Sequence, residues 1–215
     1  PTFTGAGQKF RVRAQYGLQR QDYIISFTEP WFMNEQLAVG GDIFYSQADF
    51  LSSFYNERRV GGDVRVSRAL DEYMALDFMY KYEIIDIFDI ATNASQILQA
   101  EQGERSKSSI LLAFTRDERD SVFLPSKGYK LTVFGELAGG PLAGQTDIYK
   151  IGLSAQKFFL MPWEEKHIIS LNFAATTVNR FGDSNRVPIF DRLFLGGAYD
   201  LRGFNYRDIS PVDGN

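Results

Sequence analysis

The sequence contains no cysteine and one histidine, His167, among its 215 residues. The lack of cysteine excludes disulfide scaffolds and thiolate metal sites, and a lone histidine has no second soft ligand with which to hold a metal. No apolar run approaches the ~18 residues of a membrane-spanning helix, and the first residues lack the basic and apolar regions of a signal peptide. The net charge of −4 argues against nucleic acid as a partner. We expect no metal and no cofactor, and a chain that is either not exported or part of something longer.

Aromatic residues are abundant, at 15% of the sequence. They take part in a strict alternation of apolar and polar residues that recurs along the chain, in 8–18, 60–67, 74–83, 147–157 and 167–175. This period of two is typical of β-strands with two different faces. The alternating segments are longer than the strands of a soluble sandwich and fit the ~9 to 11 residues of a strand in a membrane barrel. The pattern predicts an all-β fold, a transmembrane antiparallel up-and-down β-barrel.

In such a barrel, apolar side chains face lipid and polar side chains face the interior. We expect the outward-facing set to include Phe10, Val12, Tyr16, Val64, Leu76, Phe78, Tyr149, Ile151, Leu171 and Phe173. The inward-facing set is expected to include Lys9, Arg11, Arg13, Asp63, Arg65, Asp77, Lys150 and Asn172.

The connections between strands predict two unlike ends. We expect strands near 8–18, 22–31, 37–47, 58–69, 73–85, 107–118, 128–138, 146–159 and 166–179. Short turns join some of them, whereas 48–59 and 91–109 are expected to be long loops, the second with a short helix or a polar surface loop after residue 95. Trp31, Pro125 and Trp163 should therefore lie at one rim, and Asp49, Gln99, Pro141 and Asp183 at the other.

Charged residues occur at two unusual places. In 195-LGGAYDLRGF-204, Arg202 stands in a glycine-rich stretch, where it either pairs with a carboxylate inside the barrel or lies on an exposed turn. In 115-TRDERD-120, the acids alternate with arginines. This alternation favours a charge-paired strand end over acid–base catalysis. Nothing in the sequence predicts an enzyme.

These stretches resemble the BamA-like family of outer-membrane β-barrel assembly factors, in the family's order along essentially the whole chain. The similar stretches are 26-SFTEPWF-32, 39-VGGDIFY-45, 116-RDERDSVFLPSKGYKLTVFGELAGG-140 and 201-LRGF-204. The resemblance implies a strand-turn motif of Asp117, Arg119, Asp120, Pro125 and Gly128, and a loop motif of Leu201, Arg202, Gly203 and Phe204 supported by Gly196 and Gly197.

The resemblance also implies an architecture. Residues 1–179 would form the third to eleventh strands of a barrel of roughly sixteen strands. Residues 180–215 would form the sixth extracellular loop, which folds back into the barrel so that Arg202 reaches an acid on the wall. In the family that acid lies on strands after the motif, which this sequence does not contain, so Asp63, Asp77 and Glu136 are fallback candidates for the contact.

The implied function is not enzymatic. It is the folding and insertion of β-barrel proteins into the outer membrane. The implied partners are unfolded outer-membrane clients, periplasmic and lipoprotein subunits of an assembly complex, and outer-membrane lipid. Two alternatives are a two-partner-secretion transporter of the same superfamily and a passive porin-type channel; an enzyme barrel ranks last.

Overall fold

The computed structural model describes residues 7–18, 20–52, 55–163, 167–182, 184–196, 201 and 203–204. Nine strands dominate these residues. They are β1 (Lys9–Tyr16), β2 (Arg20–Glu29), β3 (Leu37–Ser52), β4 (Tyr55–Ala69), β5 (Met74–Phe88), β6 (Gly103–Asp117), β7 (Gly128–Ala138), β8 (Ile148–Leu160) and β9 (Ile168–Arg180). The short helical turns are η1 (Phe32–Asn34), α1 (Gln96–Gln99), η2 (Gly140–Leu142) and η3 (Ile189–Asp191).

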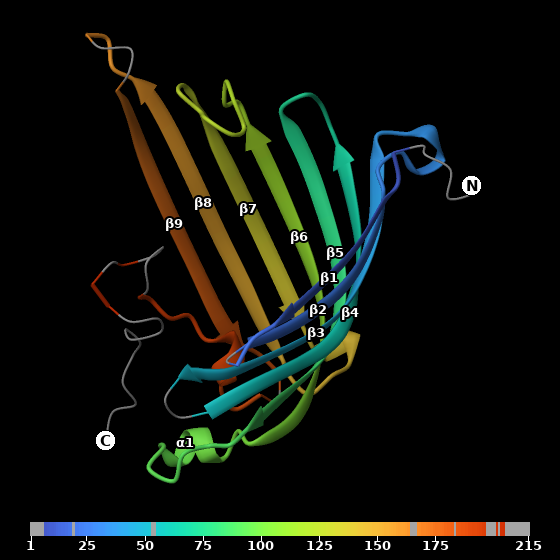
Figure 1. Ribbon diagram of the computed structural model, residues 1–215, viewed down its shortest axis with the longest axis vertical. Helices are drawn as coiled ribbons and strands as arrows, with labels where there is room; N and C mark the ends of the chain where they lie inside the picture. Colours follow the sequence, from blue (N-terminus) through green and yellow to red (C-terminus); the bar gives the residue numbers. More distant parts are fainter. Residues whose placement is uncertain are drawn as a thin grey trace.

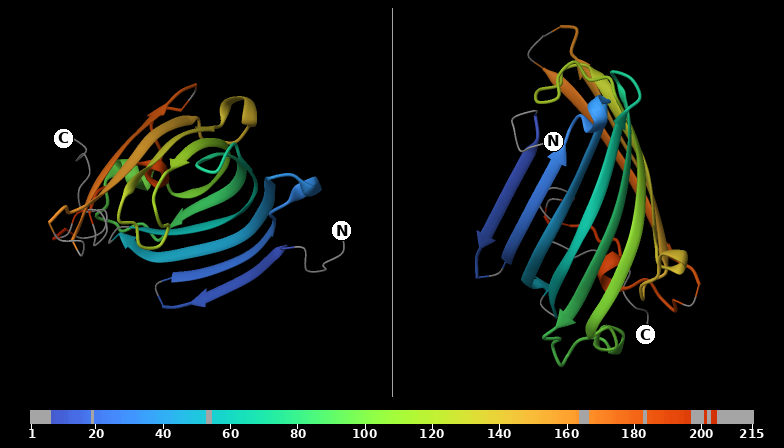
Figure 2. Two further views of the ribbon diagram at one scale, coloured as in Figure 1. Left: turned by 90° about the horizontal axis from the view of Figure 1, so that it is seen from above. Right: turned by 90° about the vertical axis from the view of Figure 1, so that its right-hand side faces the viewer.

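The strands form one sheet in which each strand pairs with the next along the chain. The order is β1 to β9 without a crossover, and every pairing is antiparallel. The sheet curves strongly, and β1 and β9 stand apart at its two edges (Figures 1 and 2). This open, curved, up-and-down sheet confirms the predicted fold class. Within the described residues, no helix has the length and apolar character needed to cross a membrane.

The residues predicted for the two rims lie at opposite ends of the sheet, but connection length does not distinguish the ends, because the β3–β4 hairpin is shorter than the β6–β7 connection at the other end. The β4–β5, β6–β7 and β8–β9 turns lie at the upper end in Figure 1, whereas α1 lies at the lower end. The up-and-down order places Trp31, Pro125 and Trp163 at the upper end, which we call the turn end. It places Asp49, Gln99 and Pro141 at the opposite loop end, whereas Asp183 lies outside the described residues.

The predicted alternation of faces is confirmed by the strand register. The concave side of the sheet is its inner face and the convex side its outer face. Lys150 lies in one row of cross-strand neighbours with Glu136, Leu111, Met79, Arg65, Gly40, Thr28 and Lys9, and Lys150 contacts a segment on the concave side. Neighbouring rows alternate, so Ile151 and Val64 are on the outer face, each 53% exposed. The two predicted sets of side chains therefore lie on opposite faces of the sheet. That the outer face contacts lipid and the inner face lines a lumen stays a prediction.

The prediction of a long loop over 48–59 is wrong. β3 continues to Ser52 and β4 begins at Tyr55, so the two strands form a tight hairpin. The charged stretch after Tyr55 looked like loop sequence, but its charges are matched within the sheet. Arg58 forms an ion pair of 2.5 Å with Asp86 on β5, the neighbouring strand.

The predicted loop over 91–109 also extends too far at its C-terminal boundary. β6 begins at Gly103, and its first residues, expected to be loop, pair with the end of β5. A helix does form after residue 95, as one of the two alternatives held, but α1 has only four residues. Ser95 caps it, because its side chain accepts a hydrogen bond from the Leu98 amide.

Candidate functional site

Residues 184–196, which we call the inner segment, follow β9 and lie against the inner face at the loop end (Figure 2). Phe190 of η3 is only 6% exposed and belongs to an apolar cluster with Tyr55, Ile85 and Ile87. These residues come from the extended ends of β4 and β5. Burial of a phenylalanine side chain contributes about 1.5 to 3 kcal/mol. This apolar contact holds the inner segment against the sheet but does not set the orientation of the segment.

The orientation of the inner segment is set by four charged side chains, which we call the inner-wall charge cluster: Lys107, Glu136, Lys150 and Asp191. Asp191 Oδ1 lies 2.6 Å from Lys107 Nζ and 3.4 Å from Lys150 Nζ. Glu136 Oε1 lies 2.9 Å from Lys107 Nζ, and its Oε2 lies 3.7 Å from Lys150 Nζ. Lys107 and Asp191 are 3% and 5% exposed, so the charges are largely removed from water.

The cluster balances two cations on β6 and β8 with one carboxylate on β7 and one on the inner segment. Without Asp191, the wall would hold two lysines and one acid. Removal of one partner from a buried ion pair is costly, since the remaining charge loses its compensation without regaining water. The wall is therefore electrostatically complete only when the inner segment is docked.

A second contact joins the inner segment to the loop that carries α1. Glu101 Oε2 accepts a hydrogen bond of 2.7 Å from the backbone N–H of Ile189, the first residue of η3. Glu101 Oε1 lies 3.7 Å from Arg192 Nη2. The buried Glu101 thus holds both ends of η3, and it couples the β5–β6 connection to the segment after β9.

Arg59 on β4 provides a third contact. Its Nη2 donates to the carbonyl oxygen of Phe190 at 3.4 Å, while its Nε lies 2.5 Å from Glu57 and its Nη1 3.7 Å from Glu83. The guanidinium therefore links the wall to the backbone of η3. Contacts from β4, β6 and β8 and from the α1 loop all converge on three consecutive residues of the inner segment, 189–191.

The predicted loop motif lies beyond this anchored stretch. Arg202 and Gly197 are outside the described residues, so the pairing predicted for Arg202 stays a prediction. Leu201 and Phe204 are 42% and 49% exposed, and Gly203 has a φ of +96°, a left-handed conformation that favours glycine. Among the acids considered as partners, Glu136 is engaged by the lysines of the cluster, and Asp63 Oδ1 lies 3.4 Å from Arg65 Nε.

The predicted strand-turn motif forms a compact turn between β6 and β7. Asp117 accepts two hydrogen bonds of 2.7 Å from Nε and Nη2 of Arg119, a bidentate pair. Asp120 accepts hydrogen bonds from the Ser126 hydroxyl and from the backbone N–H groups of Ser126 and Lys127. These donors, the Ser126 hydroxyl first, lower the pKa of Asp120 to about 2. The carboxylate therefore stays ionised at physiological pH and closes the turn in front of Pro125.

Gly128 is required at the end of this turn. Its φ is +96°, and a Cβ atom there would lie 2.1 Å from the carbonyl oxygen of Glu118. We expect Gly128→Ala to destabilise the folded protein by about 1 to 3 kcal/mol. Gly135→Ala, on the same strand, is the matched control, because a Cβ atom there would meet nothing within 4 Å. Urea titration of the two variants in detergent should separate them, and equal midpoints would contradict a strained turn.

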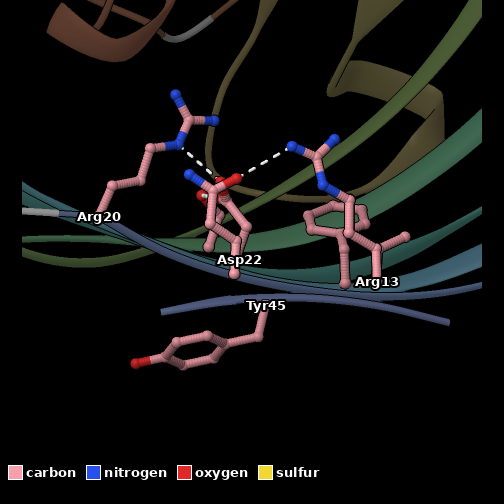
Figure 3. A pocket seen from close by; sticks show the side chains of 8 residues that line it. Arg13, Arg20, Asp22 and Tyr45 are labelled. Atoms are coloured by element: carbon pink, nitrogen blue, oxygen red, sulfur yellow. Dashed lines mark hydrogen bonds and ion pairs between the residues drawn. The ribbon is translucent and has the colours of Figure 1, made fainter. Parts of the chain in front are cut away.

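Charged residues also line the inner face near the β1 edge (Figure 3). Arg13, Arg20 and Asp22 project to one side of the strands, and Tyr45 projects to the other, as the alternation requires. Arg20 Nε lies 2.7 Å from Asp22 Oδ2, and Ser46 donates to Asp22 at 2.6 Å. These side chains border a hollow of about 420 Å³.

Residues 3–215 match the family model of the Omp85 superfamily domain. The chain belongs to the Omp85 superfamily. One relative is the outer membrane protein assembly factor BamA of Nitratidesulfovibrio vulgaris, which is 30% identical over 209 residues, 97% of this chain and 26% of that protein. The human sorting and assembly machinery component 50 homolog is 26% identical over 216 residues, 98% of this chain and 44% of that protein.

The same architecture occurs in a solved Omp85 structure. The crystal structure of BamA from Haemophilus ducreyi lacking POTRA domains 1–3 superposes with a TM-score of 0.83 at 17% identity, over 95% of this chain and 41% of that one. This likeness shows the fold. The Omp85 chain described here spans less than half the length of these relatives. The resemblance to BamA-like proteins drawn from the motifs is confirmed.

Sequence reasoning missed Arg59, Glu101, Lys107 and Asp191 of this site, together with the contact of Lys150 with Asp191. The sequence does contain a signal for Asp191. In 188-PIFDRLF-194 an acid and a base stand between apolar residues, and in 201-LRGF-204 the base Arg202 also stands among apolar residues. Nothing local identifies Lys107 as the partner of Asp191, or Glu101 as the partner of Ile189 and Arg192. Those contacts depend on how three distant parts of the chain meet.

Proposed function

We propose that this chain is part of an outer-membrane assembly factor that folds and inserts β-barrel proteins. The observation that supports this proposal most strongly is the position of the inner segment. Asp191 and the lysines of β6 and β8 hold that segment against the wall of an Omp85 sheet. The names of its relatives, an outer membrane protein assembly factor and a sorting and assembly machinery component, support the same conclusion. The turn end would face the periplasm, and the loop end the exterior.

The physical problem in this function is the backbone of the client. A strand that enters a bilayer must pair its N–H and C=O groups, because each unpaired group costs several kcal/mol in hydrocarbon. An assembly factor can solve this by offering the unpaired edge of one of its own strands, to which a client strand adds. In this proposal, β1 to β9 are the stable wall, and the inner segment braces that wall from inside while an edge elsewhere in the protein opens.

The role is not enzymatic in this proposal, and the acids of 117–120 act as structural groups. Asp117 and Asp120 are both fully engaged in closing a turn. The partners would be unfolded outer-membrane proteins, outer-membrane lipid, and the periplasmic and lipoprotein subunits of an assembly complex.

A polypeptide transporter of the same superfamily is the second candidate, because it would share both the sheet and a folded-in segment. A passive porin is less well supported, since the inner segment lies against the inner face at the loop end and is fixed there by buried charges. Several POTRA repeats in the full-length protein would favour the assembly factor, and two would favour the transporter.

Reconstitution of the full-length protein in liposomes tests the function directly. An unfolded barrel client is added from urea, and its folding is followed by the shift in electrophoretic mobility of the folded form. We expect faster client folding than in liposomes without the protein, and little ion conductance. Conductance without any acceleration of client folding would point to a channel instead.

A further inference from the structure

The outer face carries charged side chains at the turn end of β6, β7 and β8. The Glu118 amide donates to the carbonyl oxygen of Tyr129 at 2.8 Å, and Tyr129 pairs with Lys157. These three residues therefore form one row across three strands, with Arg116 one position deeper on the same face. We call Arg116, Glu118, Tyr129 and Lys157 the outer rim cluster. It lies on the opposite side of the sheet from the inner segment.

The contacts within the outer rim cluster leave one cation without an acid. Glu118 Oε1 accepts hydrogen bonds from Arg116 Nε at 2.7 Å and from the Tyr129 hydroxyl at 2.9 Å. Lys157 Nζ instead lies 5.2 Å from the centre of the Tyr129 ring and 5.7 Å from that of Phe159. Among the residues that the structure describes, no carboxylate lies within ion-pair distance of Lys157. Within the outer rim cluster, two cations therefore share one carboxylate, and that carboxylate contacts Arg116.

The position of Lys157 indicates which ligand its ammonium group can bind. Aromatic side chains are exposed around it, Phe159 on the outer face and Trp163 at the adjacent turn. Such residues mark the level of lipid headgroups in membrane barrels, and lysine and arginine side chains reach the same level with their apolar stems. An ammonium group held over aromatic rings keeps three N–H donors for an acceptor. A lipid phosphodiester at this level supplies one negative charge and acceptor oxygens.

We propose that the outer rim cluster binds the phosphate group of an anionic phospholipid in the leaflet that surrounds the turn end. Lys157 is the principal contact, and Arg116 contributes the N–H groups that Glu118 leaves available. The orientation in the membrane rests on the proposed function, which places the turn end in the periplasmic leaflet. The site lies on the outer face, so it does not require the inner segment or an open edge.

Native mass spectrometry of the full-length protein, released from nanodiscs that contain phosphatidylglycerol and phosphatidylethanolamine, measures the binding. We expect the wild-type protein to retain phosphatidylglycerol preferentially. Lys157→Ala should lower that retention roughly tenfold, as expected for the loss of one hydrogen bond to a charged group. Lys157→Arg should keep most of it. Wild-type retention in Lys157→Ala would overturn the proposal.

Lys130→Ala is the matched control. It removes the same charge one residue away from Tyr129, but on the inner face of β7. Its retention of phosphatidylglycerol should equal that of the wild type, and an equal loss in both variants would reduce the effect to net charge. Excess inorganic phosphate should not displace the lipid; displacement would identify a simple anion site. Lipid retention without client folding in liposomes would contradict the proposed function alone, because the two readouts are independent.

Discussion

Replacement of Asp191 by alanine in the full-length protein should release the inner segment and destabilise its docking by about 3 to 5 kcal/mol. Asp191 is 5% exposed, and its carboxylate is the only acid that the inner segment contributes to the inner-wall charge cluster among the described residues. Without it, Lys107 and Lys150 share Glu136 alone. The excess positive charge would then stand on a buried wall.

Limited proteolysis measures this release, because a segment that leaves the inner face exposes its backbone to protease. We expect cleavage within 184–196 in Asp191→Ala and protection in the wild type. Glu104→Ala, which removes an exposed acid from the same strand as Lys107, is the control and should be protected. The double variant Asp191→Ala/Lys107→Ala restores the charge balance and should lose less than the sum of the single changes. Full protection of Asp191→Ala would show that the apolar contacts of Phe190 suffice.

Replacement of Arg202 by alanine is expected to have a similarly large effect, about 3 to 5 kcal/mol of loop docking, if the guanidinium pairs with a buried carboxylate. Arg202→Lys should rescue the loss only in part, because an ammonium group cannot make the bidentate contact. The measurement is the protease sensitivity of 180–215, together with outer-membrane protein assembly in cells that depend on this protein.

Arg186→Ala is the control for Arg202. Arg186 belongs to the same stretch after β9, and its guanidinium is only at the limit of hydrogen bonding, 3.5 Å from the carbonyl oxygen of Ile97. We expect its variant to behave like the wild type. If Arg202→Ala also keeps the wild-type cleavage pattern, Arg202 is an ordinary surface residue. If both are independent anchors, the effects of Asp191→Ala and Arg202→Ala should add.

The fold could be predicted because its main determinant is local. In a strand, neighbouring side chains point to opposite faces, so an alternation such as that of 74–83 identifies both the strand and its two faces. Pro125 and Trp163 lie in alternate connections of the predicted strand order, and strands that alternate in direction bring such connections to the same end. In an up-and-down sheet each strand pairs with the next along the chain, so the order of the strands in the sheet is their order in the sequence.

The strand ends were harder to predict, because polar strands that extend past the alternating stretch resemble loops. Arg58 and Asp86 lie in such an extension, and only their pairing across β4 and β5 shows that they belong to the sheet. The cluster around Asp191 was beyond sequence reasoning for a related reason. Asp191 is 84 positions from Lys107 in the sequence and 41 positions from Lys150, so no local pattern brings these residues together.

Complementation in cells depleted of their own assembly factor tests the central claim most directly. The full-length protein is expressed as wild type, Asp191→Ala or Glu104→Ala, and the amount of folded outer-membrane porin is measured. We predict that wild type and Glu104→Ala restore porin assembly and that Asp191→Ala falls well below both at equal protein levels. Failure of the wild type to restore assembly, or full restoration by Asp191→Ala, would contradict an assembly factor whose wall depends on its docked inner segment.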